Sequence, residues 1–392
     1  MEPNTIIISH TSNIADLQPE WEELEHAGVC SPYQQYAWVK NFLDNITPKS
    51  PEHYYFVTLH DQNQLVAILP FVQRTQLSCR ILSWVGNEHF NYYGALYDQA
   101  FLKQLSPTNF HLLWERIKKS LPSFDLLSLK NQLSSAENAL NPFEWLNATP
   151  SANLSHQLIY PHHDWGKLLI SLRGKKTRKR MRNEESRLNR EGELRWWEVT
   201  SAQEIEQYLP ELFSQRENRL HALGIQIHEK TEEYTQLYSG LLISSLDNAD
   251  RPTRMIIIKL DEHLLAAIVL FKWKNAYYPL INSITETRYR NWSPGEYLLR
   301  IMMTLGCEEK IEFVDYGLGE DGYKTAWCNH TTPLFDTLIA ETNKGKLVSS
   351  AIHHQQQLKR KIKHSPKLWE LYRRLRKWRG KISTQTETTT SS

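Results

Sequence analysis

The same order of predicted elements occurs twice along this 392-residue chain. Residues 53–73 predict two strands joined by a polar turn, because β-branched and aromatic runs are bounded there by turn residues. Residues 254–273 repeat that hairpin, with Asp61 and Asp261 at equivalent points in the two turns. An internal repeat constrains the architecture more than any single motif does, because each copy has its own apolar faces to bury.

The elements around the two hairpins also correspond. Each hairpin follows an amphipathic helix, near 14–28 and 202–220, with apolar residues at helical spacing. Each half then runs through a helix into a strand, over 109–129 and 296–316. The order helix, hairpin, further strand, helix, strand resembles that of an acyl-CoA-dependent N-acetyltransferase (GNAT) unit. We therefore expect an α/β (α+β) fold of two tandem GNAT-like units, each a mixed, mostly antiparallel sheet flanked by helices. Two unrelated α/β domains are the alternative.

The expected domains are 1–160, 161–345 and 346–392. The stretch SANLSHQLIYPHHDW near the first boundary indicates a connecting strand or linker. After it, the run from Arg173 to Gly192 predicts a strongly basic helix with few apolar positions. Beyond about 345 the repeated pattern stops and a basic helical tail begins.

Composition and cysteine spacing narrow the function classes. The formal net charge is +2, so the protein as a whole is not a polyanion binder and we expect no nucleic-acid partner. The four cysteines lie far apart without a CxxC spacing, which argues against a metal site and suggests a reducing compartment. No secretion signal or bilayer-length apolar stretch is evident, so we expect a cytoplasmic protein.

A glycine-rich acidic turn follows the predicted strand at 313–316, in the segment FVDYGLGEDGYKTAW. Glycines at 317, 319 and 322 let the backbone approach another group closely, and such turns at strand ends usually serve a site. The turn gathers four candidate residues: Glu320, Asp321, Tyr323 and Lys324.

These residue types suit acyl transfer from a thioester, which needs a proton acceptor for the nucleophile and a proton donor for the thiolate. Tyr323 could protonate the thiolate, and Glu320 or Asp321 could accept the proton. Lys324 could orient an acidic or phosphorylated group. A structural turn with solvated charges is the alternative.

A second candidate site lies at RNWSPGEYLL, residues 290–299. Ser293, Pro294 and Glu296 fit a capping box with proline at the first helical position. A helix N-terminus after a strand can hold a pyrophosphate, with Arg288 or Arg290 as counter-charge. A well-capped helix without a ligand is the alternative. The candidate cofactor-binding residues are Arg290, Ser293, Gly295, Glu296 and Tyr297.

Other parts of the second half complete the candidate site. The predicted strand at 276–283 would supply a backbone donor to the thioester carbonyl. Arg216 and Arg219, on the polar face of the preceding helix, are candidate substrate residues together with Lys324 and Trp327.

The C-terminal tail carries eleven Lys and Arg residues between 359 and 381, against one acidic residue, Glu370. Its segment KLWELYRRLRKWR predicts a basic amphipathic helix. Such a helix fits an anionic membrane surface, where each cation contributes about 1 kcal/mol. RNA, an acidic partner, or packing on the rest of the protein are the alternatives.

Residues 25–340 resemble the CelD-like acetyltransferases of cellulose and exopolysaccharide synthesis, which belong to the GNAT superfamily and are related to Fem-type transferases. The most specific marks are SPGEYLL at 293–299 and FVDYGLGEDGYKTAW at 313–327. Less specific ones are SPYQQYAWV, LVAILPFV, FDLLSL, LFSQRENR and LLAAIVLF. The family's usual ending has Gly-Asp-Glu before x-Tyr-Lys; here Glu320 and Asp321 are exchanged, which moves one carboxylate by a position.

The resemblance implies an acyltransferase that uses acetyl-CoA or another acyl-CoA, with the donor site in the second half. The expected acceptor is an amino sugar, a polysaccharide precursor or a lipid-linked glycan, and the basic tail would keep the enzyme at the inner membrane face. An aminoacyl-tRNA-dependent transferase of the Fem type, with tRNA on the basic run 173–190, is one alternative. A non-catalytic scaffold that binds glycan or partner proteins is the other.

Overall fold

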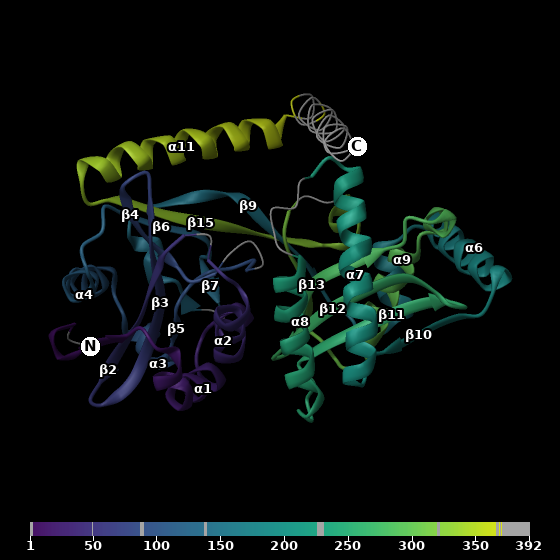
Figure 1. The fold of residues 1–392 in the computed structure, drawn as a ribbon, viewed down its shortest axis with the longest axis horizontal. Helices are drawn as coiled ribbons and strands as arrows, with labels where there is room; N and C mark the ends of the chain where they lie inside the picture. The colour runs from purple at the N-terminus through teal and green to yellow at the C-terminus, as the bar shows by residue number, and fades with distance from the viewer. Residues whose placement is uncertain are drawn as a thin grey trace, which may run out of the picture. The chain divides into compact units, whose positions relative to one another are not determined.

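The computed structural model describes residues 3–48, 50–86, 90–136, 139–225, 231–319 and 322–365, together with 368 and 370. The chain forms two compact units, which can be followed by colour in Figure 1. Unit 1 consists of Met1–Ser155 and Thr332–Lys361, and unit 2 of His156–Thr331 and Ile362–Ser392. Two of the three boundaries fall inside strands, and the third falls inside a helix.

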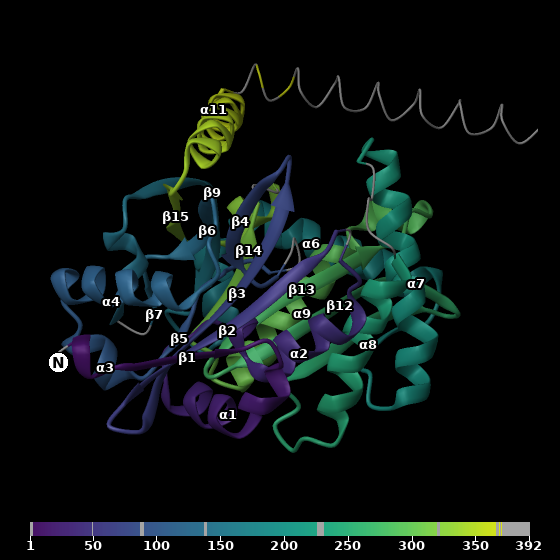
Figure 2. The same ribbon diagram turned by 60° about the vertical axis from the view of Figure 1, so that its left-hand side comes forward.

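Unit 1 contains a sheet whose first four strands are antiparallel neighbours, and Figure 2 shows β1, β2 and β3 side by side. Across the sheet the strands are β1 (Ile7–Thr11), β2 (Glu52–Asp61), β3 (Gln64–Gln76), β4 (Cys79–Trp84), β6 (Leu126–Leu133), β15 (His330–Ala340) and β9 (Ala148–Ile159). The pair β4–β6 is parallel. Small additions are β5 (Leu96–Tyr97) beside β3 and the two-stranded sheet of β7 (Ser135–Ala136) and β8 (Ala139–Leu140).

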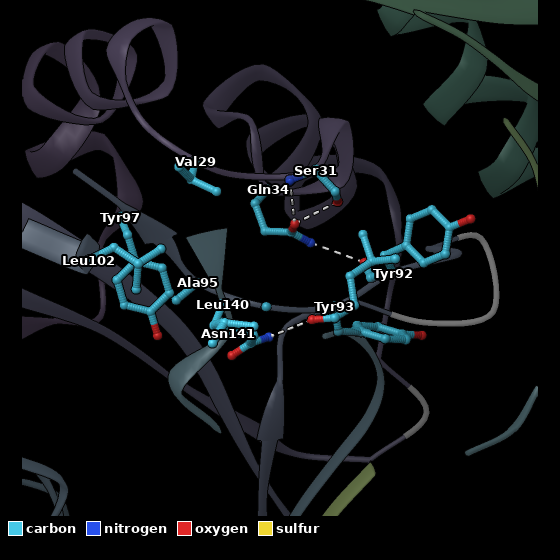
Figure 3. Close-up of a pocket in the computed structure, with 12 residues that line it drawn as sticks. Val29, Ser31, Gln34, Tyr92, Tyr93, Ala95, Tyr97, Leu102, Leu140 and Asn141 are labelled. Atoms are coloured by element: carbon cyan, nitrogen blue, oxygen red, sulfur yellow. Dashed lines mark hydrogen bonds between the residues drawn. The ribbon is translucent and has the colours of Figure 1, made fainter. Parts of the chain in front are cut away.

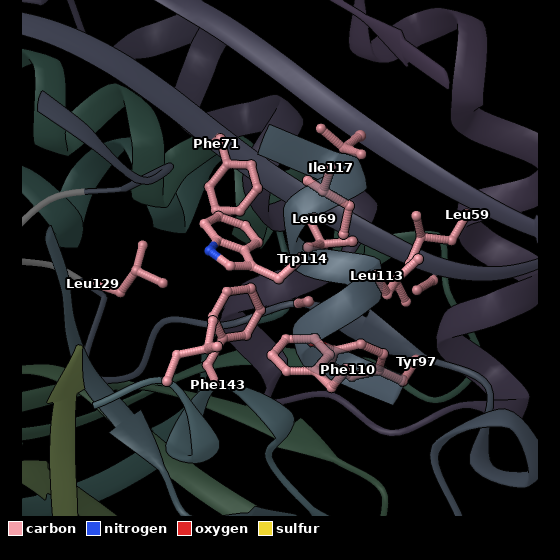
Figure 4. Packing of buried hydrophobic residues seen from close by; sticks show 14 of the residues in the cluster. Leu59, Leu69, Phe71, Tyr97, Phe110, Leu113, Trp114, Ile117, Leu129 and Phe143 are labelled. Atoms are coloured by element: carbon pink, nitrogen blue, oxygen red, sulfur yellow. The ribbon is translucent and has the colours of Figure 1, made fainter. Parts of the chain in front are cut away.

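The helices of unit 1, except the last, bury apolar residues in its core. They are α1 (Gln18–Ala27), α2 (Tyr36–Asn45), α3 (Gln99–Gln104), α4 (Pro107–Ser120) and α11 (Asn343–His364), with short 3₁₀ turns η1 (Pro3–Thr5), η2 (Ile14–Leu17), η3 (Pro32–Gln34) and η4 (Pro142–Trp145). On α4, Phe110, Leu113, Trp114 and Ile117 are buried at helical spacing, so one face of the helix enters the core. Figure 4 shows these side chains in the core, with Phe110 and Trp114 beside the ring of Phe143.

Unit 2 repeats the sheet. Its strands are β10 (Leu194–Glu198), β11 (Thr253–Leu260), β12 (His263–Trp273), β13 (Ala276–Ile284) and β14 (Phe313–Leu318), in that order across the sheet, with β9 beside β14. The first three pairs are antiparallel and β13–β14 is parallel. The pattern matches that of β1, β2, β3, β4 and β6 in unit 1.

Helices cover both faces of the unit 2 sheet, as Figure 1 shows for α7, α8 and α9. They are α5 (Trp165–Leu172), α6 (Lys175–Glu191), α7 (Ala202–Ala222), α8 (Thr231–Leu246), α9 (Pro294–Glu308) and α10 (Gly322–Trp327), with the 3₁₀ turn η5 (Arg288–Trp292). Helices α7 and α8 pack together on one face, and α9 contacts α5, α6 and the sheet. The predicted fold class, two mixed and mostly antiparallel α/β units, is confirmed.

The structure contains elements that the sequence pattern did not show, and the turn of the first hairpin begins one residue later than expected. Each unit has an extra strand, β1 or β10, and a second helix, α2 or α8, before the hairpin. Asp61 closes the first hairpin as the last strand residue, opposite Gln64, whereas Asp261 lies in the turn itself with φ of 50°. The two aspartates are therefore offset by one position, and the expected equivalence is wrong.

Residues 332–361 pack with unit 1, whereas the sequence pattern placed them in 161–345 and in the tail. The cause is the pairing of β15 with β6 and the contacts of Asp125. The Asp125 carbonyl accepts from the Glu341 N–H at 2.9 Å, and its carboxylate accepts from the Thr342 hydroxyl at 3.0 Å. Gly345 lies so close to the Asp125 carbonyl that a Cβ there would stand 1.8 Å from the oxygen. These contacts fix where α11 begins.

The basic tail lies mostly outside the described residues. The structure describes the tail to 365 and then only 368 and 370, so the amphipathic helix expected at 367–379 is untested. Within the described part of the chain, no helix combines the length and the apolar character that a membrane span requires.

Phe143 tests the packing of unit 1. Its ring is fully buried and its centroid lies 5.0 Å from that of Trp84 and 5.2 Å from that of Phe110. We expect Phe143→Ala to lower the free energy of urea-induced unfolding by about 3–5 kcal/mol, because it leaves a cavity among rings. The control Leu112→Ala, on an α4 side chain that is 54% exposed, should change it by less than about 0.5 kcal/mol. Equal effects of the two changes would contradict this packing.

Candidate functional site

A cavity of about 500 Å³ in unit 2 brings many of the predicted site residues together. Its walls come from α7, β13, η5, the first turn of α9 and α10, with Arg173 from the loop before α6. The predicted site residues that line it are Arg219, Arg290, Ser293, Gly295, Glu296, Tyr323 and Trp327. Of the remaining predictions, Glu320 and Asp321 lie outside the described residues.

One wall of the cavity is the end of β13, which carries Asn282 and Ile284, beyond its pairing with β14. β13 and β14 pair only at Ala276 with Phe313 and at Tyr277 with Val314. From Pro279 to Ile284, β13 has no partner strand on this edge within the described part of the chain. Backbone groups of an unpaired edge can bond an extended ligand, as they would bond a strand. The expected backbone donor at 276–283 falls on this edge.

The capping box expected at Ser293 and Glu296 is wrong. Ser293 has φ of 52° and ψ of 50°, in the left-handed region, and its side chain makes no capping hydrogen bond. A capping side chain needs extended backbone at this position, which Ser293 does not have. Its carbonyl instead accepts from the backbone N–H groups of Glu296 at 3.0 Å and Tyr297 at 3.2 Å.

The open end of α9 contrasts with the matching helix of unit 1. There Ser106, with φ of −98° and ψ of 158°, caps α4 by accepting from the Asn109 N–H at 3.3 Å. At α9 the matching residue, Ser293, makes no such side-chain bond. A helix N-terminus without a side-chain cap can accommodate an anion, because the positive end of the helix dipole lies there.

The charges around the cavity favour an anionic ligand. Three arginines and one glutamate line it. Arg290 pairs with Glu286, and Arg219 forms no ion pair with any described residue. Glu296 faces cations on both sides, with its carboxylate 3.4 Å from the Arg180 guanidinium and 4.0 Å from that of Arg173. The positive excess is what a phosphate-bearing ligand would need.

Tyr323 and its neighbours come from the short helix α10. Tyr323 is half-buried, lines the cavity, and stands edge-on to Tyr316 with ring centroids 6.1 Å apart. Lys324 is 5% exposed, donates to the Leu318 carbonyl and does not line the cavity. Trp327 is 1% exposed and forms part of the wall. Tyr323 is therefore part of the cavity wall, whereas Lys324 supports the turn.

Two other predicted residues do not line the cavity. Arg216 is half-buried on α7, one turn from Arg219. Tyr297 is half-buried beneath the Arg300 guanidinium, which lies 5.0 Å from its ring centroid, and burial raises the pKa of Tyr297. Their roles in binding stay predictions.

Arg173 is a cavity residue that the sequence pattern marked only as the start of a basic run. It is 9% exposed, and its guanidinium carbon lies 3.7 Å from the centroid of the Trp327 ring. It also donates to the Ala326 carbonyl, and burial lowers its pKa. One sequence carries no signal for a pair so far apart in the chain.

A cysteine acyl intermediate does not fit this site. Cys328 directly follows α10, and burial raises its pKa to about 12. It is therefore a neutral thiol near pH 7, and the thiolate is the nucleophilic form. The geometry favours direct transfer to an acceptor. Among the described residues, no group of His, Cys, Asp and Glu is placed to hold a metal ion.

Unit 1 has cavities of a different kind. One of about 40 Å³ has room for only about one water molecule, and Figure 3 shows Gln34 in its wall, accepting from Ser31 and donating to the Tyr92 carbonyl. Another of about 310 Å³ is lined by Arg74, Lys130 and residues of β3, β4, β6 and α11, with none from α4. Neither reaches a helix N-terminus as the unit 2 cavity does.

The backbone at Ser293 yields a stability prediction. A left-handed residue other than glycine costs about 1–2 kcal/mol, so Ser293→Gly should raise the free energy of unfolding by about 0.5–1 kcal/mol. Ser293→Val should lower it by about 1–2 kcal/mol, because a β-branched residue tolerates this conformation poorly. Thermal unfolding measures both changes. Identical melting temperatures for the three proteins would contradict the left-handed start of α9.

Comparison with known proteins places this site in a family domain. Residues 175–325, fewer than half of the chain, match the model of the acetyltransferase (GNAT) domain family. None of the curated proteins compared matches the sequence.

Solved structures are similar to this chain at low sequence identity. FemX is 10% identical, covers 88% of this chain and 100% of its own, and has a TM-score of 0.56. The C-terminal domain of a candidate lysylphosphatidylglycerol synthetase from Agrobacterium fabrum is 11% identical, covers 87% and 96%, and has a TM-score of 0.51. A tandem GNAT protein from the clavulanic acid biosynthesis pathway is 11% identical, covers 86% and 98%, and has a TM-score of 0.44. The segment of unit 2 at 175–325 thus matches the GNAT acetyltransferase domain family, and the chain is similar in fold to FemX.

Proposed function

We propose that this protein is an acyltransferase that binds acyl-CoA in the unit 2 cavity and transfers the acyl group to an amine or hydroxyl of a sugar. The observation that carries the proposal is the cavity itself, where the open N-terminus of α9, an unpaired strand edge and Tyr323 meet. The match of residues 175–325 to the GNAT domain supports it.

The proposed binding of acyl-CoA rests on the positive groups that line the cavity. The Gly295 N–H and the Arg290 guanidinium suit the pyrophosphate of acyl-CoA, and both line the cavity. The pantetheine arm would lie along the unpaired edge of β13, where a backbone N–H can donate to the thioester carbonyl. This donor stabilises negative charge on that oxygen as the tetrahedral centre forms.

The proposed transfer step uses Tyr323, in the cavity wall formed by α10, and a carboxylate from the turn that precedes it. The acceptor nitrogen or oxygen bonds to the thioester carbonyl carbon, and the carbon–sulfur bond breaks. The Tyr323 hydroxyl donates its proton to the departing thiolate. The acceptor's proton goes to a carboxylate, for which Glu320 and Asp321 are the proposed bases.

The acceptor we propose is an amino sugar, a polysaccharide precursor or a lipid-linked glycan, as the CelD-like resemblance of 293–299 and 313–327 implies. We place the enzyme in the cytoplasm at the inner membrane face. The support is the excess of cations between 359 and 381, which suits an anionic lipid surface.

Titration calorimetry with acetyl-CoA tests the donor. We expect a dissociation constant in the micromolar range, about −8 kcal/mol, for the wild type. Arg290→Glu should weaken binding at least about tenfold, because it places a negative charge beside the pyrophosphate. The matched control Arg195→Glu, on an exposed side chain of β10 away from the cavity, should bind as the wild type does. Equal affinity of the Arg290→Glu and wild-type proteins would contradict the proposed donor site.

A Fem-type, aminoacyl-tRNA-dependent transferase is the second candidate, and the surface of α6 favours it. Eight Lys and Arg residues stand against three Glu along this helix. The exposed cations are Lys175, Lys176, Lys179, Arg180, Arg182, Arg187 and Arg190. Such a row can contact successive phosphates of a nucleic acid.

Salt dependence separates the two candidates. If the donor is aminoacyl-tRNA, its affinity should fall by at least about a hundredfold between 50 and 200 mM salt, and Lys175→Glu/Lys179→Glu should weaken it. If the donor is acyl-CoA, we expect no specific tRNA binding in a filter assay and an unchanged acetyl-CoA affinity in that variant. A wild type that binds neither donor would indicate a non-catalytic scaffold.

A further inference from the structure

Arg173 joins the two parts of the proposed site that must act together. The residue precedes α6, yet its guanidinium reaches both α10 and the first turn of α9. On α10 it stacks 3.7 Å from the centroid of the Trp327 ring and donates to the Ala326 carbonyl. On α9 its terminal nitrogen lies 4.0 Å from the Glu296 carboxylate.

These contacts are unusual for a surface cation. Arg173 is 9% exposed, and Trp327 beneath it is 1% exposed, so the stack is shielded from water. A cation over an aromatic ring is strongest where both are desolvated. Burial also lowers the pKa of Arg173, which shows that keeping this charge inside has a cost that the contacts must offset.

The Nε–H of Arg173 adds a second observation. It is buried with no hydrogen-bond partner among the described residues, although Arg173 lines the cavity. A buried donor without a partner is destabilising, and a helix that needed only anchoring could use an apolar contact instead. A charged group kept in this place indicates a role in the site.

We infer that Arg173 is a positioning residue of the transfer reaction: it holds α10, and with it Tyr323, against the cavity beside the open end of α9. The inference rests on the proposed function for the reaction it serves, but the contact with α10 can be measured without any activity. Tyr323 lies one helical turn before Trp327 on α10, so holding the Trp327 ring and the Ala326 carbonyl fixes the direction of the Tyr323 hydroxyl.

Hydrogen–deuterium exchange of the full-length protein tests the contact. Arg173→Gln removes the charge and the stack, so the amides of 322–328 should exchange about tenfold faster, while those of the hairpin 253–273 keep their rates. Arg173→Lys keeps the charge but not the flat guanidinium, so its exchange rates at 322–328 should lie between those of the wild type and of Arg173→Gln. The matched control Arg182→Gln, on an exposed side chain of α6, should leave both segments unchanged.

Calorimetry with acetyl-CoA on the same variants separates positioning from binding. We expect Arg173→Gln to weaken acetyl-CoA binding by less than about tenfold, because Arg290 and the start of α9 remain, while release of the coenzyme A thiol with an amino sugar as the acceptor falls by about a hundredfold, as for Tyr323→Phe. Unchanged exchange at 322–328 in both Arg173 variants would overturn the inference whatever the donor is. Faster exchange there in a protein whose wild type binds no acetyl-CoA would instead overturn the proposed donor and leave the contact standing.

Discussion

The separation of β13 from β14 is the constraint on which the unit 2 site depends. The two strands are held parallel by only two residue pairs, at Ala276 and Tyr277. Beyond these pairs the facing edges of β13 and β14 make no hydrogen bonds to each other, so backbone groups on these edges are available to another partner. The end of α9 and the helix α10 border the cavity beside β13, so a ligand that supplies both strand-like hydrogen bonds and negative charge would fit it.

Because the two units repeat the same sheet, the differences between their helix starts indicate which unit can hold a ligand. β4 and β6 also pair over only two residues, so unit 1 has the same parting of strands. There Ser106 caps α4 in the ordinary way, and the cavity between β4 and β6 has no wall from α4. In unit 2 a left-handed Ser293 leaves the helix end open and Arg290 stands beside it. The same sheet pattern therefore carries an uncapped helix end beside a cavity in unit 2, whereas the matching helix of unit 1, α4, is capped and lines neither of the two cavities described there.

Local sequence patterns were enough to predict the fold. They predicted fewer details of the candidate site. The two hairpins and the charged helix at 175–191 follow from periodicity, which acts within a few residues. The start of α9 was placed correctly, but a backbone conformation replaced its expected cap, and one sequence does not encode φ at a serine. The stack of Arg173 on Trp327 joins distant positions, for which a single chain gives no signal.

A crystal structure of the protein with coenzyme A tests the central claim most directly. The account predicts pyrophosphate density within hydrogen-bond distance of the Gly295 N–H and the Arg290 guanidinium, with the pantetheine arm along residues 279–284 and the sulfur near the Tyr323 hydroxyl. Coenzyme A bound in unit 1, or bound in unit 2 with its pyrophosphate away from the start of α9, would contradict it.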